Sequence, residues 1–165
     1  MTLFDFTADD APADWRSIDD VVMGGVSEST FEATDAGATF RGTVSLEQGG
    51  GFASVRAPDR ARDLSAHTAF QLRLRGDEQA YWWTAYTGPN SPSYRARLHP
   101  TPDWATVTVP FDALTPYHRG THVPDAPPFD PASVYSVGFL IADEQDGPFG
   151  LEVAWIRAVD APAAA

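Results

Sequence analysis

The 165-residue sequence contains no cysteine and no lysine, and each absence narrows its chemistry. Without cysteine there is no disulfide framework, thiolate zinc site, iron-sulfur cluster or cysteine nucleophile. Without lysine, all 11 basic residues are arginine, and 23 acidic residues give a formal net charge of -12. Because this charge gives no nonspecific attraction to phosphate backbones or anionic lipid, we expect binding neither to nucleic acid nor to membrane surfaces.

Long apolar runs are also missing from the chain. No segment approaches the roughly 20 apolar residues of a membrane-spanning helix, and residues 1–10 lack the basic and apolar regions of a secretory signal. We therefore expect no membrane insertion and a cytoplasmic location. Hydrophobic residues still make up 43% of the chain, which is enough for one sizeable core. We expect a single domain over residues 1–159 and a disordered tail over residues 160–165.

Short segments of high β-propensity, separated by 13 glycines and 14 prolines, dominate the sequence. Apolar and polar side chains alternate in residues 70–75, 40–46 and 94–99, which is typical of strands with one face on a core. Residues 137–142 are apolar on both faces. The predicted strands cover residues 3–6, 26–33, 38–46, 52–56, 69–75, 80–87, 94–99, 104–109, 134–142 and 150–157. This pattern predicts an all-β fold, a two-sheet antiparallel β-sandwich of the jelly-roll type.

Residues 117–131 contain four prolines, too many for the interior of a strand or helix. We predict a long ordered loop here. Near its end, Asp130 followed by Pro131 predicts the N-cap and first residue of a short helical turn.

The sequence carries no nucleophile elbow, phosphate-binding loop or dinucleotide-binding motif. His118 and His122 have a spacing that some metal sites use, but they lie in the proline-rich segment, where no helix aligns them. We expect the acidic pairs to lie on a solvated surface and no cofactor to be bound. The alternative is a Ca²⁺ site near the meeting point of the first and last strands, with Asp19, Asp20 and Asp143 as ligands.

Five arginines occupy the polar positions of predicted strands. They are Arg41, Arg73, Arg75, Arg95 and Arg97. If these strands share a sheet, the guanidinium groups form one positive face in an acidic protein, and Trp82 or Tyr86 lies beside it. Such a face can stack on a sugar or hold an anionic group. The alternative is that acids such as Glu47, Asp77 or Glu152 neutralise the arginines.

Eight sequence blocks occur in an order that resembles one known family. They cover residues 15–27, 40–47, 50–56, 72–77, 104–110, 116–120, 137–143 and 147–152. Together they resemble the complex I intermediate-associated protein 30 family over residues 4–157. The Asp-x-x-Met-Gly-Gly-x-Ser block at residues 20–27 is the most specific of them.

The resemblance implies a galactose-binding-like β-sandwich, in agreement with the predicted strands. The mitochondrial family member is an assembly factor for NADH:ubiquinone oxidoreductase. The resemblance therefore implies a non-enzymatic binding protein, an assembly or chaperone-like factor whose protein partners include respiratory-complex subunits. The alternatives are a carbohydrate-binding or small-ligand-binding module and, third, an enzyme of unknown reaction.

Within the matching blocks, Arg56, Arg119 and Asp143 are polar residues that packing does not explain. The sequence departs from the family at residues 81–87, where Trp82 and Trp83 occur. We combine these polar residues with the arginines and aromatics of the predicted strands. The predicted partner-binding or ligand-binding residues are Arg56, Arg73, Arg75, Trp82, Tyr86, Arg95, Arg97, Arg119 and Asp143.

Overall fold

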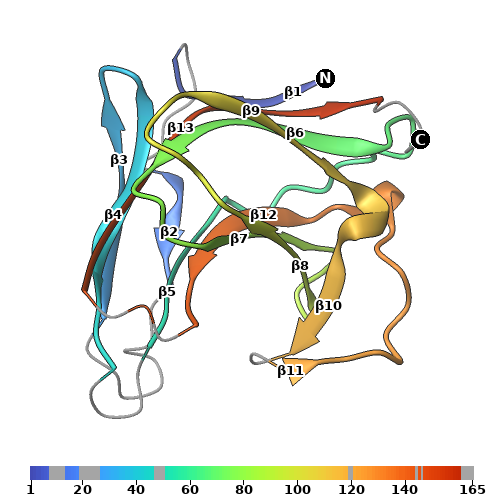
Figure 1. Cartoon of the computed structure of the whole chain (residues 1–165). Helices are drawn as coiled ribbons and strands as arrows, with labels where there is room; N and C mark the ends of the chain where they lie inside the picture. The colour runs from blue at the N-terminus through green and yellow to red at the C-terminus, as the bar shows by residue number, and fades with distance from the viewer. Residues whose placement is uncertain are drawn as a thin grey trace.

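Two antiparallel sheets pack face to face in the computed structural model (Figure 1). It describes residues 1–7, 14–18, 27–46, 51–118, 121–143, 145 and 147–160. The first sheet has the strand order β3-β4-β13-β6-β9, and β1 pairs with β13. The second sheet has the order β11-β10-β8-β7-β12-β5-β2. The strands are β1 (Thr2–Asp5), β2 (Arg16–Ser17), β3 (Glu28–Thr34), β4 (Gly37–Val44), β5 (Ala53–Arg56), β6 (Ala69–Gly76), β7 (Tyr81–Tyr86), β8 (Ser93–Leu98), β9 (Ala105–Pro110), β10 (Thr115–His118), β11 (Thr121–His122), β12 (Ser136–Ile141) and β13 (Gly147–Val159).

The alternation of apolar and polar residues determines which face of each strand meets the core. In β6, Phe70, Leu72 and Leu74 are at most 1% exposed, and the polar residues between them are half-buried on the other face. All six residues of β12 are buried, as its apolar sequence predicts. The all-β two-sheet sandwich predicted from the sequence is therefore confirmed.

Aromatic side chains fill the space between the sheets. The ring of Phe139 in β12 is fully buried, and its centroid lies 5.2 Å from that of Trp83 and 6.2 Å from that of Trp15. Phe70 in the first sheet packs edge-on against Trp83 at 5.2 Å. Such edge-to-face contacts add to the free energy gained from burial, so these rings join the two sheets into one core.

Gly138 in β12 lies opposite Arg56 of β5 on one side and Thr84 of β7 on the other. A Cβ atom at this position would lie 2.3 Å from the backbone oxygen of Val55. The close approach of β5 to β12 therefore requires glycine here.

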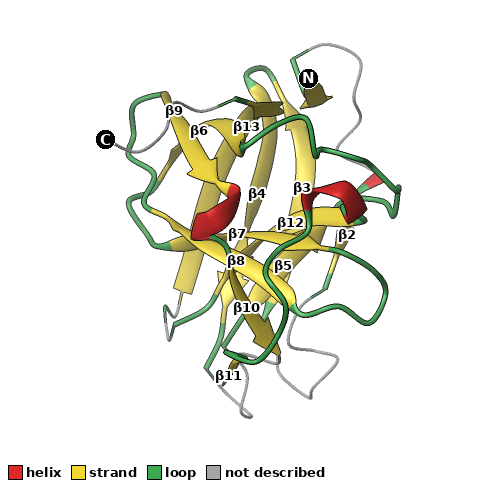
Figure 2. Cartoon of the chain, turned by 90° about the vertical axis from the view of Figure 1, so that its right-hand side faces the viewer, coloured by secondary structure: helices red, strands yellow, loops and turns green. Residues whose placement is uncertain are grey.

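Residues 123–130 cross one side of the sandwich and lead to a 3-10 turn at Pro131–Ser133 (Figure 2). Phe129 is buried, with its ring centroid 5.5 Å from that of Tyr94. The predicted helix start is confirmed, because Asp130 Oδ1 accepts a hydrogen bond from the backbone N–H of Ala132. The predicted loop is confirmed for residues 123–130 and wrong before them, where the structure has β10 and β11. Among the described residues, no helix has the length and apolar character needed to cross a bilayer.

The first and last strands meet in the first sheet, as the sequence analysis expects. Thr2 of β1 pairs with Arg157 of β13. The N-terminal amino group donates a hydrogen bond to the backbone oxygen of Ala158 (2.9 Å), and the N–H of Ala158 donates one to the oxygen of Met1 (2.8 Å). Both ends of the described chain therefore lie on the same sheet.

Candidate functional site

The second sheet turns one face toward the core and the other away from the first sheet. In β7, Tyr81, Trp83 and Ala85 belong to the core, so Trp82 and Tyr86 point outward. The sheet is bowed: its β10 end curves away from the first sheet, whereas β5 and β2 lie against β3 and β4 (Figure 1). We call this outward side the arginine face. Its defining residues are Arg16, Arg56, Trp82, Tyr86, Arg95, Arg97 and Tyr117.

Three arginines of this face lie over three aromatic rings. The guanidinium carbon of Arg56 is 3.6 Å from the ring centroid of Tyr86. Arg97, directly opposite Trp82 in the sheet, lies 4.1 Å from the indole centroid. Arg95 lies 5.1 Å from the ring centroid of Tyr117. Stacking on an aromatic ring stabilises a guanidinium and leaves its N–H groups at the rim free to bind other groups.

Asp143 holds one of these pairs in place. It follows β12 with a φ of 64°, a left-handed backbone conformation that aspartate tolerates better than most residues. Its Oδ2 accepts a hydrogen bond from Trp82 Nε1 and another from an Arg97 NH group, both at 3.0 Å. One carboxylate oxygen therefore positions both the indole and the guanidinium.

Arg56 and Arg95 have no carboxylate partner within ion-pair distance among the described residues. Arg95 Nε donates a hydrogen bond to Ser93 Oγ (3.0 Å). Burial lowers the pKa of Arg95, although nearby Tyr86, Tyr117 and Asp143 favour the charged form. The Nε atom of Arg56 is enclosed and has no hydrogen-bond acceptor in the part of the chain that the structure describes. These guanidinium groups are partly removed from water, and no carboxylate of the described residues lies within ion-pair distance of them, which is energetically unfavourable.

The arginines of the first sheet are in a different situation, because acids neutralise two of them, Arg41 and Arg75. Arg41 pairs with Glu32 at 3.0 Å, and Arg75 forms two hydrogen bonds with Glu152. Arg73 donates a hydrogen bond to Thr106 Oγ1 at 3.3 Å. For Arg75 the structure thus confirms the ion-pairing alternative.

The single arginine-rich face expected from the sequence is wrong. Arg41, Arg73 and Arg75 lie in the first sheet, whereas Arg95 and Arg97 lie in the second. The sheets pack through their apolar faces, so the two groups of polar side chains point to opposite sides of the molecule. Strand β7 pairs with β8 and β12, and Trp82 therefore lies beside Arg97 rather than beside Arg73 and Arg75.

Six of the predicted site residues come together on or beside the arginine face. They are Arg56, Trp82, Tyr86, Arg95, Arg97 and Asp143. Arg119 lies outside the described residues. Sequence reasoning missed two members of the face, Arg16 and Tyr117. Arg16 directly follows the buried Trp15. This change from an apolar to a polar residue was the sequence signal that could have placed Arg16 on the outward side.

The described residues contain no group of three or more His, Asp or Glu side chains that could hold a metal ion. In the β10–β11 pair, His118 lies opposite Thr121 and His122 lies opposite Tyr117. Asp19 and Asp20 of the calcium alternative lie outside the described residues, and Asp143 Oδ2 bonds to Trp82 and Arg97. The calcium site stays a prediction.

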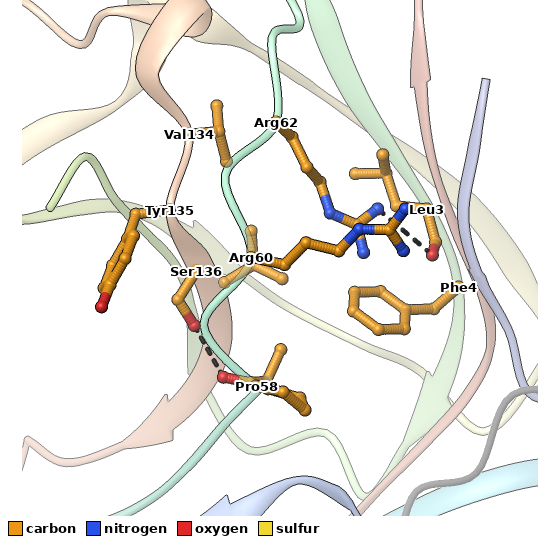
Figure 3. A pocket seen from close by; sticks show the side chains of 10 residues that line it. Leu3, Phe4, Pro58, Arg60, Arg62, Val134, Tyr135 and Ser136 are labelled. Carbon is orange, nitrogen blue, oxygen red and sulfur yellow. Dashed lines mark hydrogen bonds between the residues drawn. The ribbon is translucent and has the colours of Figure 1, made fainter.

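Two hollows lie away from the arginine face. One, of about 10 Å³, lies between β1 and residues 57–62, where Arg62 stacks over Phe4 at 4.9 Å (Figure 3). This volume is no larger than one water needs. The other is an open depression of about 460 Å³ on the first sheet, lined by the paired Arg41, Arg75 and Glu152. Neither hollow combines open volume with unpaired charge.

The fold resembles carbohydrate-binding modules. The family 11 carbohydrate-binding module of a cellulosomal cellulase from Clostridium thermocellum superposes with a TM-score of 0.71 at 16% identity, covering 98% of this chain and 94% of the module. The Clostridium thermocellum family 11 module in complex with a β-1,3-1,4-mixed-linked tetrasaccharide gives 0.68 at 15% identity, covering 97% of each chain. An exo-β-agarase gives 0.64 at 11% identity, covering 98% of this chain and 25% of the agarase.

At these identities the likeness concerns the fold, which is the jelly-roll sandwich that the strand pattern predicts. No curated protein matches the chain in sequence. The family model for complex I intermediate-associated protein 30 matches residues 4–153, which include all of the second sheet and the outward side chains described above. The chain therefore belongs to the complex I intermediate-associated protein 30 family.

Proposed function

We propose that this protein is a non-enzymatic binding protein that holds a protein partner during the assembly of a larger complex, and that it binds this partner through the arginine face. The family description, which refers to intermediates of complex I, supports a role in assembly. The three arginines stacked on aromatic rings are the observation that most directly supports binding at the arginine face. Among the described residues, only Arg97 of the three has a carboxylate partner. Arginine, tyrosine and tryptophan are the residue types that contribute most to protein–protein binding.

Affinity capture from the protein's own cells tests this proposal. Arg56→Glu/Arg97→Glu reverses two charges on the arginine face. Arg41→Glu/Arg73→Glu reverses two charges on the first sheet and is the matched control, because both variants have the same net charge. We expect mass spectrometry to identify respiratory-complex subunits that the native protein and the control retain and that the first variant loses. If all three proteins retain the same set, the proposal is wrong, provided that thermal unfolding shows each of them folded.

Carbohydrate binding is a second candidate, because one structural neighbour is a module in complex with a tetrasaccharide and the arginine face carries three aromatic rings. Sugar rings stack on open aromatic faces. Here Trp82 is only 8% exposed and Arg97 lies over its ring, which favours a protein partner instead. Affinity electrophoresis in a β-1,3-1,4-glucan gel tests this candidate. If the gel retards the native protein but not Tyr86→Ala, the result favours carbohydrate binding.

A further inference from the structure

The arginine face contains a repulsion between two arginines that no ion pair of the described residues compensates. Arg16 of β2 lies directly opposite Arg56 of β5 in the antiparallel pair. Like charges in this position destabilise a sheet. Asp59, close to the same edge, accepts a hydrogen bond from Tyr135 Oη at 3.1 Å and is not within ion-pair distance of either arginine. An anion bound at this edge would remove a repulsion that the described residues leave in place.

The strand register places Arg95, which also has no ion-pair partner among the described residues, on the same line across the sheet. Arg56 lies opposite Gly138, Gly138 opposite Thr84, and Thr84 opposite Arg95. With strands about 4.8 Å apart, the Cα atoms of Arg56 and Arg95 are separated by about 14 Å. In an extended peptide, residues four apart are separated by about 13 Å and point to the same side. Acidic residues alternating with small ones therefore match the Cα spacing of the two arginines.

The chemistry of the face favours carboxylates over a neutral sugar. Guanidinium groups bind carboxylates in a planar, two-pronged geometry. Asp143 already shows how a carboxylate fits, since its Oδ2 bonds both Trp82 Nε1 and Arg97. The arginines lie over the rings of Trp82, Tyr86 and Tyr117, and those rings do not offer an open platform for a pyranose.

We infer that the arginine face binds an acidic, extended segment of a protein partner, with the guanidinium groups of Arg56 and Arg95 contacting two of its carboxylates. This inference rests on the proposed function and names the chemistry of the partner. The net charge of -12 does not oppose it at physiological salt, because charges farther away than about 8 Å are largely screened.

Fluorescence anisotropy with a labelled peptide tests the inference. The probe is a seven-residue peptide in which glutamate alternates with serine, and its control has glutamine in place of glutamate. At 0.15 M salt we expect the glutamate peptide to bind the native protein and Arg41→Gln/Arg73→Gln alike. We expect Arg56→Gln/Arg95→Gln to bind it at least about tenfold more weakly, because two charge-assisted contacts are lost. The glutamine peptide should bind none of them.

The inference is overturned if the glutamate peptide binds no form of the protein, or if it binds all variants equally. It is also overturned if an oligogalacturonate binds with the expected arginine dependence and the peptide does not. The last result would assign the face to an acidic sugar. If Arg56→Gln/Arg95→Gln does not fold, Arg56→Lys/Arg95→Lys replaces it. This variant keeps both charges but loses the planar geometry, and we expect it to bind at least about threefold more weakly.

The peptide and capture experiments can fail separately. If Arg56→Glu/Arg97→Glu loses its partner in cells but the glutamate peptide does not bind, the inference about acidic segments is wrong and the proposed function stands. If the peptide binds as expected while capture retains nothing that depends on the arginine face, the proposed function fails and recognition of carboxylates remains.

Discussion

At the residue scale, Asp143 is the protein's own carboxylate beside the arginine face, where Arg56 and Arg95 have no ion-pair partner among the described residues. Its Oδ2 accepts a hydrogen bond from Arg97, and the side chains of Arg97 and Asp143 are 45% and 38% exposed. An exposed pair of this kind contributes little to folding, about 0 to 1 kcal/mol. Its larger effect is on binding, because a ligand carboxylate that approaches Arg97 has to compete with Asp143.

Asp143→Asn removes this competition and retains a residue that tolerates the left-handed backbone conformation. We expect the glutamate peptide to bind this variant about two- to fivefold more tightly, which corresponds to the free energy of one exposed ion pair. Asp35→Asn, an exposed acid between β3 and β4, is the control and should leave the affinity unchanged. Weaker binding by Asp143→Asn would mean that Asp143 positions Arg97 for the ligand rather than competing with it.

Tyr81 makes the stability of the fold sensitive to alkaline pH. Burial and the charge of Asp77, which accepts a hydrogen bond from the Tyr81 hydroxyl at 2.9 Å, raise the pKa of Tyr81. The folded-state pKa therefore exceeds the value of about 10 in the unfolded chain. The stabilisation is fully present below pH 10 and decreases as the pH rises further.

Tyr81→Phe has no hydroxyl to ionise at this position. Between pH 9 and pH 11 we expect the urea midpoint of Tyr81→Phe to decrease less than that of the native protein. The lost hydrogen bond changes the midpoint by an amount that does not depend on pH below this range, so the comparison is of slopes. Parallel curves for the two proteins over this range would show that Tyr81 does not produce the alkaline sensitivity.

At the element scale, the contact between β5 and β12 depends on Gly138. An added methyl group would meet the Val55 oxygen at 2.3 Å, so the strands must separate. We expect Gly138→Ala to lower the free energy of unfolding by about 1–3 kcal/mol, a typical cost of overpacking. It should also weaken binding of the glutamate peptide, because Arg56 lies on β5.

Gly150→Ala is the matched control for this substitution, since no atom lies within 4 Å of a Cβ built at Gly150 in β13. Urea unfolding followed by far-UV circular dichroism measures both variants. Equal destabilisation of the two would indicate a general cost of replacing glycine in a strand rather than a close contact between β5 and β12.

The alternation of side chains in single strands could be predicted from sequence, whereas the pairing of strands could not. Phe70 and Arg73 have opposite parity in β6, and this is enough to assign one to the core and the other to solvent. Whether Arg73 and Arg95 share a sheet depends on long-range chain reversals that no local pattern encodes. The predicted joint surface of these arginines failed for this reason.

Short strands with weak local signals were also beyond the sequence. Strand β11 has only two residues, and β10 contains Pro116, which argues against a strand. Tertiary pairing with β8 decides the conformation of β10. Because Tyr117 lies on this strand, its place on the arginine face could not be predicted either.

At the scale of the whole molecule, Phe139 joins the aromatic groups of the core, with Trp83 on one side and Trp15 on the other. We expect Phe139→Ala to lower the free energy of unfolding by about 3–5 kcal/mol, a large part of the stability of an ordinary domain. Leu46→Ala, at a side chain that is 42% exposed, should change it little.

The same unfolding experiment reports on cooperativity. Because these rings connect the two sheets, tryptophan fluorescence and far-UV circular dichroism should give one coincident transition in the native protein and in Phe139→Ala. Separate transitions would mean that the two sheets unfold independently and that the aromatic contacts between them contribute little.

The hydrogen bonds between Met1 and Ala158 place both ends of the described chain on the first sheet, whereas the arginine face is the outward side of the second sheet (Figure 1). A sensor chip or bead that holds the protein by either end therefore leaves the arginine face accessible to the surrounding solution. Immobilised protein should report the same affinity for an acidic probe whichever end is attached, and fusion to a fluorescent reporter at either end should leave recognition intact.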